Sequence, residues 1–470
     1  MTVDPTSERP DAPSGDRGAN VSAPDGGRVL RLALRVAVAM LGSGAQTDDI
    51  ETAIDTVGAA YGIDTIQRSV TFSGIAISHD PPGSGPPTTL LYTVPERVSD
   101  FARLAATSSV VRLIKAGDYD VAQAEAALDD LDRQPPPYGK AVSFVAPGIS
   151  AAGSTVVFGG APLDAAVTLA VALLIQPSLS ALERSTLPPF FRTVFGVAAS
   201  TLLVAVLVGI GLPIVGGLVL TGSLLRFMPG WALVSGFSDL IDQSIISGSA
   251  RLAEALLLGA GVAAGTGLAL VVAGSFGVEL SLVKTGPEDW GTTVAGLGAL
   301  LAVGGYAIRI GDPRGAVVSA SLLGAIAWLA LIGMRDAGVD AAVATLISAL
   351  TIGIVSRAIG IRAQAPAALW AVPAVLPLLP GLQIVEALLA RNDAARIVGL
   401  VGAAGTAFLI GAGVASGAIV VTTIRRMRTQ VSPAIDTVTS GLEVKVVAPV
   451  DRYVRERAGS VLNPHDREDG

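Results

Sequence analysis

The sequence predicts an α-helical polytopic membrane protein with a small N-terminal α/β domain. The first observation is composition: half of the 470 residues are apolar, 15% are charged and the mean hydropathy is +0.62. Soluble domains carry about a quarter charged residues. The second is distribution, because the charges concentrate before residue 140 and long charge-free runs follow. The third is the abundance of glycine, 55 residues, which lets helices pack closely in lipid.

The chain ahead of the apolar runs predicts a short tail and a folded domain. Residues 1–28 are polar and rich in proline, serine and glycine, which predicts a disordered tail. Residues 29–138 predict a cytoplasmic α/β domain, because arginines interrupt the first apolar stretch and no signal-peptide core precedes it. Its expected elements are helices at 29–41, 47–62, 96–116 and 119–132, with strands within 65–78 and at 88–94. Thr47 with Asp48 is the expected N-cap of the second helix.

Ten apolar segments beyond Lys140 are each long enough to cross a bilayer as a helix. They lie at about 141–160, 162–181, 190–209, 212–229, 253–276, 291–309, 315–334, 340–358, 366–385 and 398–424. With a cytoplasmic N-terminus, eleven arginines fall in the inside loops. The outside loops carry four basic residues, Lys284, Arg335, Arg391 and Arg396. This asymmetry predicts ten spans with both termini in the cytoplasm.

Two segments, one in each half of the apolar region, have similar sequences. RFMPGWALVSGFSDLI contains Pro229–Gly230, and LPLLPGLQIVEALLA contains Pro380–Gly381. The two Pro-Gly pairs are five predicted spans apart, so the second half would be inverted in the membrane. Inverted repeats with broken helices are common in secondary transporters. A Pro-Gly pair can also simply end a helix, and that alternative stays open.

These similarities divide the rest of the chain. Residues 139–285 form the expected first five-span repeat, 286–426 the second, and 427–470 a cytoplasmic C-terminal tail. In each repeat a GxxxG spacing, Gly261–Gly265 or Gly413–Gly417, predicts a helix-packing seam.

The candidates for a substrate or ion pathway are residues of the breaks themselves and polar or charged residues near the spans. Charge in or beside a bilayer is costly and usually functional. The candidates are Pro229, Gly230, Gly236, Asp239, Asp242, Glu254, Pro380, Gly381, Gln383, Glu386 and Asp164. Asp239 and Asp242 also suit a solvated cytoplasmic loop, and Asp164 suits a favourable acid at a helix N-terminus. A carboxylate beside an unwound helix could neutralise an amino group or exchange a proton.

Several functions lack support in the sequence. The chain has no cysteine and only His79 and His465, which excludes disulfides and a Cys- or His-rich metal site. No GxxxxGK[ST], GxSxG or HExxH motif occurs, so we expect no catalytic residue, cofactor or metal. No basic patch with interleaved aromatics predicts nucleic-acid binding. A membrane-anchored sensor remains an alternative, although ten spans exceed what an anchor needs.

This organisation resembles the threonine/serine exporter family from about Val29 to Thr423. The most specific match is MPGWALVSGFSDLIDQSIISGSARLAEA (228–255), with LPGL (379–382) as its counterpart and LGSGAQTDDIETAIDTVGAAYGI (41–63) in the N-terminal domain. The resemblance implies export of threonine and serine across the bacterial plasma membrane, driven by protons. It also implies functional roles for Pro229, Gly230, Gly236 and Asp239. Some relatives are associated with dicarboxylate export, so that cargo remains an alternative, and a homo-oligomer is compatible with this interpretation.

Overall fold

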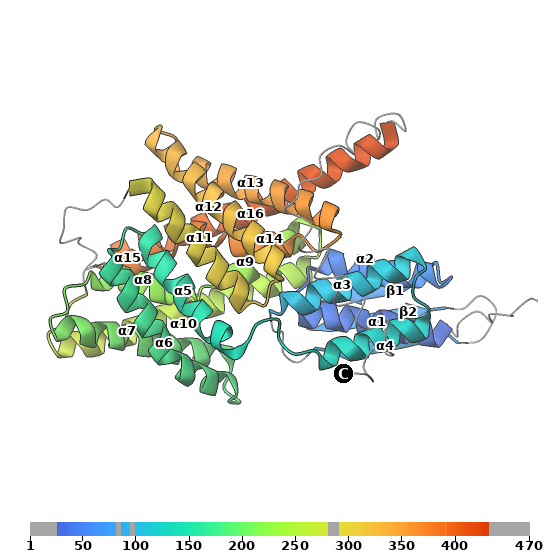
Figure 1. Cartoon of the computed structure of the whole chain (residues 1–470), viewed down its shortest axis with the longest axis horizontal. Helices are drawn as coiled ribbons and strands as arrows, with labels where there is room; N and C mark the ends of the chain where they lie inside the picture. Colours follow the sequence, from blue (N-terminus) through green and yellow to red (C-terminus); the bar gives the residue numbers. More distant parts are fainter. Residues whose placement is uncertain (1–25, 81–85, 95–98, 281–290, 391, 432–470) are drawn as a thin grey trace, which may run out of the picture.

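The computed structural model describes residues 26–80, 86–94, 99–280, 291–390 and 392–431. It has two parts: an N-terminal region (residues 26–133) and an all-helical membrane region (residues 140–431). Figure 1 shows the N-terminal region, in blue to cyan, at one end of the long axis. The predicted tails, 1–28 and 427–470, lie mostly outside the described residues. Helix α1 (Gly26–Gly42) begins three residues inside the first of them, and the last helix runs to Val431.

The N-terminal region combines four helices with an antiparallel sheet of order β1-β2-β3. After α1 come α2 (Thr47–Ala60), β1 (Gln67–Val70), β2 (Gly74–His79), β3 (Thr88–Thr93), α3 (Phe101–Ala116) and α4 (Val121–Arg133). The apolar side of α1 is buried because Val29, Ala33, Val36 and Met40 recur at helical spacing. These elements follow the predicted order. The N-cap of α2 differs, since Gln46 occupies that position and makes no side-chain cap.

The membrane region contains helices throughout its described residues. They are α5 (Lys140–Val157), α6 (Pro162–Glu183), α7 (Pro189–Gly209), α8 (Gly216–Leu225), α9 (Gly230–Ile241), α10 (Ile245–Ser275), α11 (Gly291–Arg309), α12 (Arg314–Asp336), α13 (Ala341–Ala363), α14 (Ala368–Ala374), the 3₁₀ turn η1 (Leu376–Leu378), α15 (Gly381–Leu389) and α16 (Asp393–Val431). In the described ranges, nine segments are long and apolar enough to cross a bilayer. Helices α8 and α9 qualify only as a pair, bent by 51°, and counting this pair as one broken span gives the predicted ten.

Two predicted spans extend further than their sequence boundaries. The fourth span was expected to end at 229, but helix α9 continues beyond the Pro-Gly break to Ile241. The ninth was expected to end at 385, but its path runs through α14, η1 and α15 to Leu389. The reason is that apolar residues after each break still bury a helical face. The segment from Gly230 to Ile241 is therefore a packed helix that buries Asp239, whereas Asp242 lies in an exposed turn just after it, as the solvated-loop alternative expected.

The two halves pack by the same pattern. In each half the first helix contacts the second and the third contacts the fifth, and the two first helices, α5 and α11, pack on each other. A Cβ atom at Gly265 would meet the Val194 carbonyl of α7, and one at Gly417 would meet the Leu350 carbonyl of α13. Both predicted GxxxG seams are thus confirmed as sites of close helix packing.

Candidate functional site

Each half contains one helix path that is interrupted at Pro-Gly with the same backbone geometry. Pro229 has φ −80° and ψ 48°, and Pro380 has φ −77° and ψ 41°. The N–H groups of Gly230 and Gly381 donate to the carbonyl two residues earlier, at 2.9 and 2.8 Å. These are inverse γ-turns centred on the prolines, which cannot donate a helical hydrogen bond. Similar local sequences therefore produce the same break twice.

The two breaks pack against each other. A Cβ atom at Gly230 would lie 2.9 Å from Leu379, directly before the second break. A Cβ atom at Gly381 would lie 2.5 Å from Leu225, shortly before the first break. A leucine from each broken path thus occupies the space left by the glycine of the other. Movement at one break must therefore be accommodated at the other.

A buried ion pair fixes the first break to its surroundings. Asp239 of α9 and Arg251 of α10 have side chains that are each 1% exposed, with Nε of Arg251 2.8 Å from Oδ2 of Asp239. The backbone N–H of Thr47, at the start of α2, donates to Oδ1 of Asp239 at 3.1 Å. Arg251 in turn donates to the Ala45 carbonyl at 3.0 Å. Asp239 therefore lies between a guanidinium group and a helix N-terminus, each of which places positive charge beside its carboxylate.

The loop before α2 is shaped to make this contact. Gly44 has φ +94°, a left-handed conformation that favours glycine, and a Cβ atom there would approach Trp231 to 3.4 Å. Trp231, the second residue of α9, also packs edge-on against Phe101 with ring centroids 5.7 Å apart. The 41–63 and 228–255 segments, far apart in sequence, thus form one interface between the N-terminal and membrane regions.

Two further carboxyl groups lie at this junction. The pKa of Asp49 in α2 and the pKa of Asp242, just after α9, are both raised to about 6. Burial is the main cause for each, since the surrounding protein withdraws water even though part of Asp242 remains exposed. Repulsion from Asp48 adds to the rise, and Arg357 opposes it. These groups can change protonation state under mildly acidic conditions.

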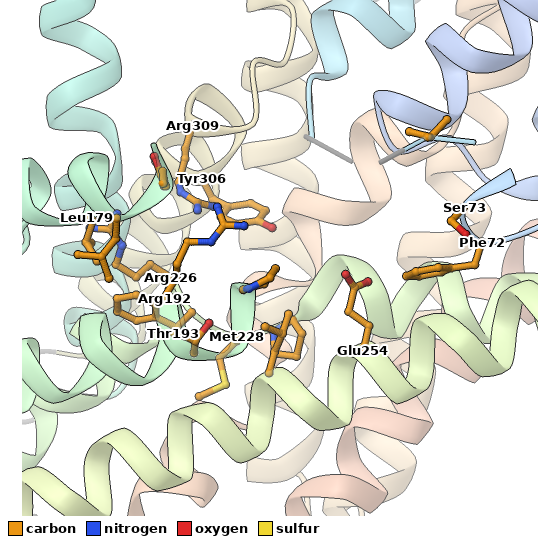
Figure 2. A pocket seen from close by; sticks show the side chains of 17 residues that line it. Phe72, Ser73, Leu179, Arg192, Thr193, Arg226, Met228, Glu254, Tyr306 and Arg309 are labelled. Carbon is orange, nitrogen blue, oxygen red and sulfur yellow. The ribbon is translucent and has the colours of Figure 1, made fainter. Parts of the chain in front are cut away.

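A cavity of about 440 Å³ lies beside the first break, in the size range of small-molecule sites. Pro229 and Met228 form part of its wall, and Phe72, Ser73 and Val94 of the N-terminal region line one side. Its ionisable lining residues are Glu183, Arg192, Arg226, Glu254, Tyr306 and Arg309. Figure 2 shows Arg226, Arg309 and Tyr306 gathered together, with Glu254 of α10 on another side of the cavity. The cavity therefore offers charges of both signs next to the broken helix.

The remaining first-half candidates have separate places. Gly236 lets α9 approach α10, because a Cβ atom there would lie 2.9 Å from Leu252. Asp164 is buried away from the cavity lining: its carboxylate accepts from the N–H groups of Ala161 and Val215, at 2.8 and 2.9 Å. It thus joins the N-terminal ends of α6 and α8.

The second-half candidates are less enclosed. Gln383 and Glu386 lie on α15 with exposed side chains. Oε1 of Gln383 accepts a hydrogen bond from Thr406 of α16 at 3.1 Å. Pro380 and Gly381 are brought to the first break, as described, but Glu386 does not take the place in its half that Asp239 takes in the first.

Sequence reasoning did not place Arg226 or Arg251 in a site: it counted both as basic residues of inside loops, and Arg251 also as part of an Ala-Arg pair repeated at Ala395–Arg396. Arg251 is buried with Asp239, and Arg226 lines the cavity. A signal was available, because an ionisable residue within an apolar segment usually has a partner of opposite charge nearby. Arg251 lies twelve positions after Asp239, and Arg226 lies three positions before Pro229.

Comparisons with known proteins agree with this architecture. A family model of the threonine/serine exporters matches residues 31–273, and a second, described as Threonine/Serine exporter, ThrE, matches residues 295–424. A protein of Mycobacterium tuberculosis described as a probable threonine/serine exporter is 31% identical over 409 residues, covering 85% of this chain and 77% of the relative. The threonine/serine exporter of Corynebacterium glutamicum is 26% identical over 413 residues, covering 85% and 83%. No solved structure matches the chain.

The first family model covers both segments that meet at the Asp239–Arg251 pair, and the second covers the other broken helix. On these matches, the chain is a member of the threonine/serine exporter family.

Proposed function

We propose that this chain is a secondary transporter that exports small hydroxy amino acids, threonine and serine, across the bacterial plasma membrane. The observation that carries the proposal is the pair of Pro-Gly breaks that pack on each other beside a charged cavity. Broken helices supply substrate sites in many secondary transporters because they expose backbone polar groups away from lipid. The descriptions of both relatives support the choice of cargo.

The export proposal is tested by threonine efflux. Cells fed a threonine dipeptide accumulate threonine, and intracellular and extracellular threonine are measured over time with and without the gene. We expect the deletion strain to retain more threonine and release less. Unchanged efflux in the deletion strain would contradict export of this amino acid.

A proton gradient is the proposed driving force, and Asp239 is its proposed coupling residue. Asp239 follows the first break and lies near Asp49 and Asp242, whose pKa values are about 6. We expect a protonophore to abolish net efflux against a threonine gradient, and Asp239→Asn to change its pH dependence. Full efflux of the variant with an unchanged pH profile would exclude a coupling role for Asp239.

The two halves are proposed to be inverted, with the N-terminal region and both termini in the cytoplasm. The five-span spacing of the breaks and the arginine asymmetry of the loops support this topology. Because the chain lacks cysteine, single exposed positions can be labelled without background. Thr186→Cys, between α6 and α7, and Ala337→Cys, between α12 and α13, occupy equivalent loops. Labelling of both from the same side would rule out inversion.

Export of a dicarboxylate is the second candidate. The observation that favours it is the excess of three arginines over two glutamates in the cavity lining. The efflux assay distinguishes the two functions when intracellular succinate is followed beside threonine. Loss of succinate release alone on deletion would favour the second candidate.

A further inference from the structure

We propose that Arg226 binds the α-carboxylate of the transported amino acid in the cavity beside the first break. This inference rests on the proposed export function and adds to it a residue and a recognised chemical group. Arg226 lies in the link between α8 and α9, three residues before Pro229, and lines the cavity. It is therefore attached directly to the first Pro-Gly break.

One end of the Arg226 guanidinium lacks an acceptor. Its Nη2 donates to Oε1 of Gln176 at 2.9 Å, which orients the group. Its Nη1 is buried and has no hydrogen-bond partner among the described residues. A buried, unsatisfied donor of a charged group is costly, and a carboxylate is the ligand that satisfies a guanidinium best. The guanidinium carbon lies over the Phe227 ring, 5.4 Å from its centroid, a cation–π contact that uses no hydrogen-bond donor.

The other cavity groups fit the rest of a zwitterion. Arg309 adds positive charge beside Arg226, and Glu183 also lies near Arg226, whereas Glu254 on another side of the cavity can receive an ammonium group. Figure 2 shows Arg226 and Arg309 on one side of the cavity and Glu254 on another. A ligand that carries two opposite charges requires such a separation. The hydroxyl groups of Thr193 and Tyr306 also line the cavity and suit a small polar side chain.

Arg226 also connects the ligand to both breaks. The residue before it, Leu225, fills the space at Gly381 in the second half. The residues after it lead to Pro229 and the first break. A carboxylate that draws the Arg226 link into the cavity would therefore shift the packing between the two halves at Leu225 and Gly381.

The test uses the purified full-length chain in lipid nanodiscs and compares L-threonine with L-threoninamide, which lacks only the carboxylate charge. Binding is measured by calorimetry. We expect the wild-type protein to prefer threonine by roughly tenfold or more, since a charge-assisted pair is lost with the amide. Arg226→Gln should reduce that preference to near unity. Arg184→Gln, an exposed arginine outside the cavity lining, is the matched control and should keep it.

Each outcome decides the matter. An unchanged threonine preference in Arg226→Gln, or none in the wild type, overturns the assignment, and so does tighter binding of succinate than of threonine. If a thermal unfolding assay shows that Arg226→Gln is not folded, Arg226→Lys replaces it. We then expect a partial loss of the preference for threonine over threoninamide, because lysine keeps the charge but lacks the planar fork. A full preference in the lysine variant overturns the proposal. Normal threonine binding without cellular efflux would contradict the export function and leave the Arg226 assignment standing.

Discussion

The two Pro-Gly breaks share a backbone but differ in their surroundings. After the first break, Asp239 is buried, paired with Arg251 and held by the N–H of Thr47. After the second break, Glu386 is exposed. The N-terminal region contacts the helix that follows the first break, through Trp231 as well as Asp239.

The repeat thus preserves the backbone break but not the side-chain chemistry around it. A γ-turn at Pro-Gly depends on two residues, so it survives in both halves. A buried carboxylate depends on partners from α10 and α2, and the chain contains one N-terminal region. The N-terminal region can therefore influence the conformation of the first break directly. The second break contacts the first break through Leu379 and Gly381.

The largest effect is expected from breaking the buried ion pair. Asp239→Asn leaves Arg251 buried without a counter-charge, which costs about 3–5 kcal/mol of stability. Thermal unfolding of the purified protein measures the loss. The double variant Asp239→Asn with Arg251→Gln removes the unpaired charge and should recover part of it. Equal destabilisation in the single and double variants would show that the pair is not the source of the cost.

A smaller effect is expected where the two breaks meet. Gly381→Ala introduces a methyl group against Leu225 and should cost about 1–3 kcal/mol by overpacking. Adding Leu225→Ala makes room and should restore a large part of threonine efflux. Gly230→Ala with Leu379→Ala is the reciprocal test. If neither leucine substitution rescues its glycine partner, the breaks are not coupled by this contact.

The junction should also respond to pH. Asp49 and Asp242 have pKa values of about 6 in the folded protein, above the ordinary value of 3.8, so the folded state holds protons that the unfolded chain releases. Their protonated forms stabilise the junction below about pH 4, and this contribution is lost as the pH rises through about 6. We therefore expect the thermal unfolding midpoint to decrease as the pH is raised from about 4 to about 6. The Asp49→Asn/Asp242→Asn variant should show a flatter profile, and an equally steep one would exclude these two groups.

The smallest effect is expected at the counterpart of Asp239. Glu386→Gln changes an exposed side chain and should alter stability by no more than about 0.5 kcal/mol. The same unfolding assay compares it directly with Asp239→Asn. A loss as large as that of Asp239→Asn would mean that the two halves carry equivalent buried carboxylates.

Much of the architecture follows from local sequence. The ten spans follow from apolar length, and the order of helices and strands before Lys140 follows from periodicity and turn residues. The position of both breaks follows from Pro-Gly, since proline removes a helical hydrogen bond wherever it occurs. The GxxxG seams could also be predicted from local sequence, because they depend only on two glycines on one helix face.

The pairing of the charged residues, by contrast, could not be predicted from local sequence. Asp239 was singled out by its place after a break, but its partners are Arg251 and the amide of Thr47, 192 residues away. Arg226 could be counted as a loop charge from sequence, yet it lines a cavity with a buried, unsatisfied nitrogen. The physical reason is that span length, breaks and seams are properties of neighbouring residues. The pairing and burial of charge depend instead on which distant segments the fold brings into contact.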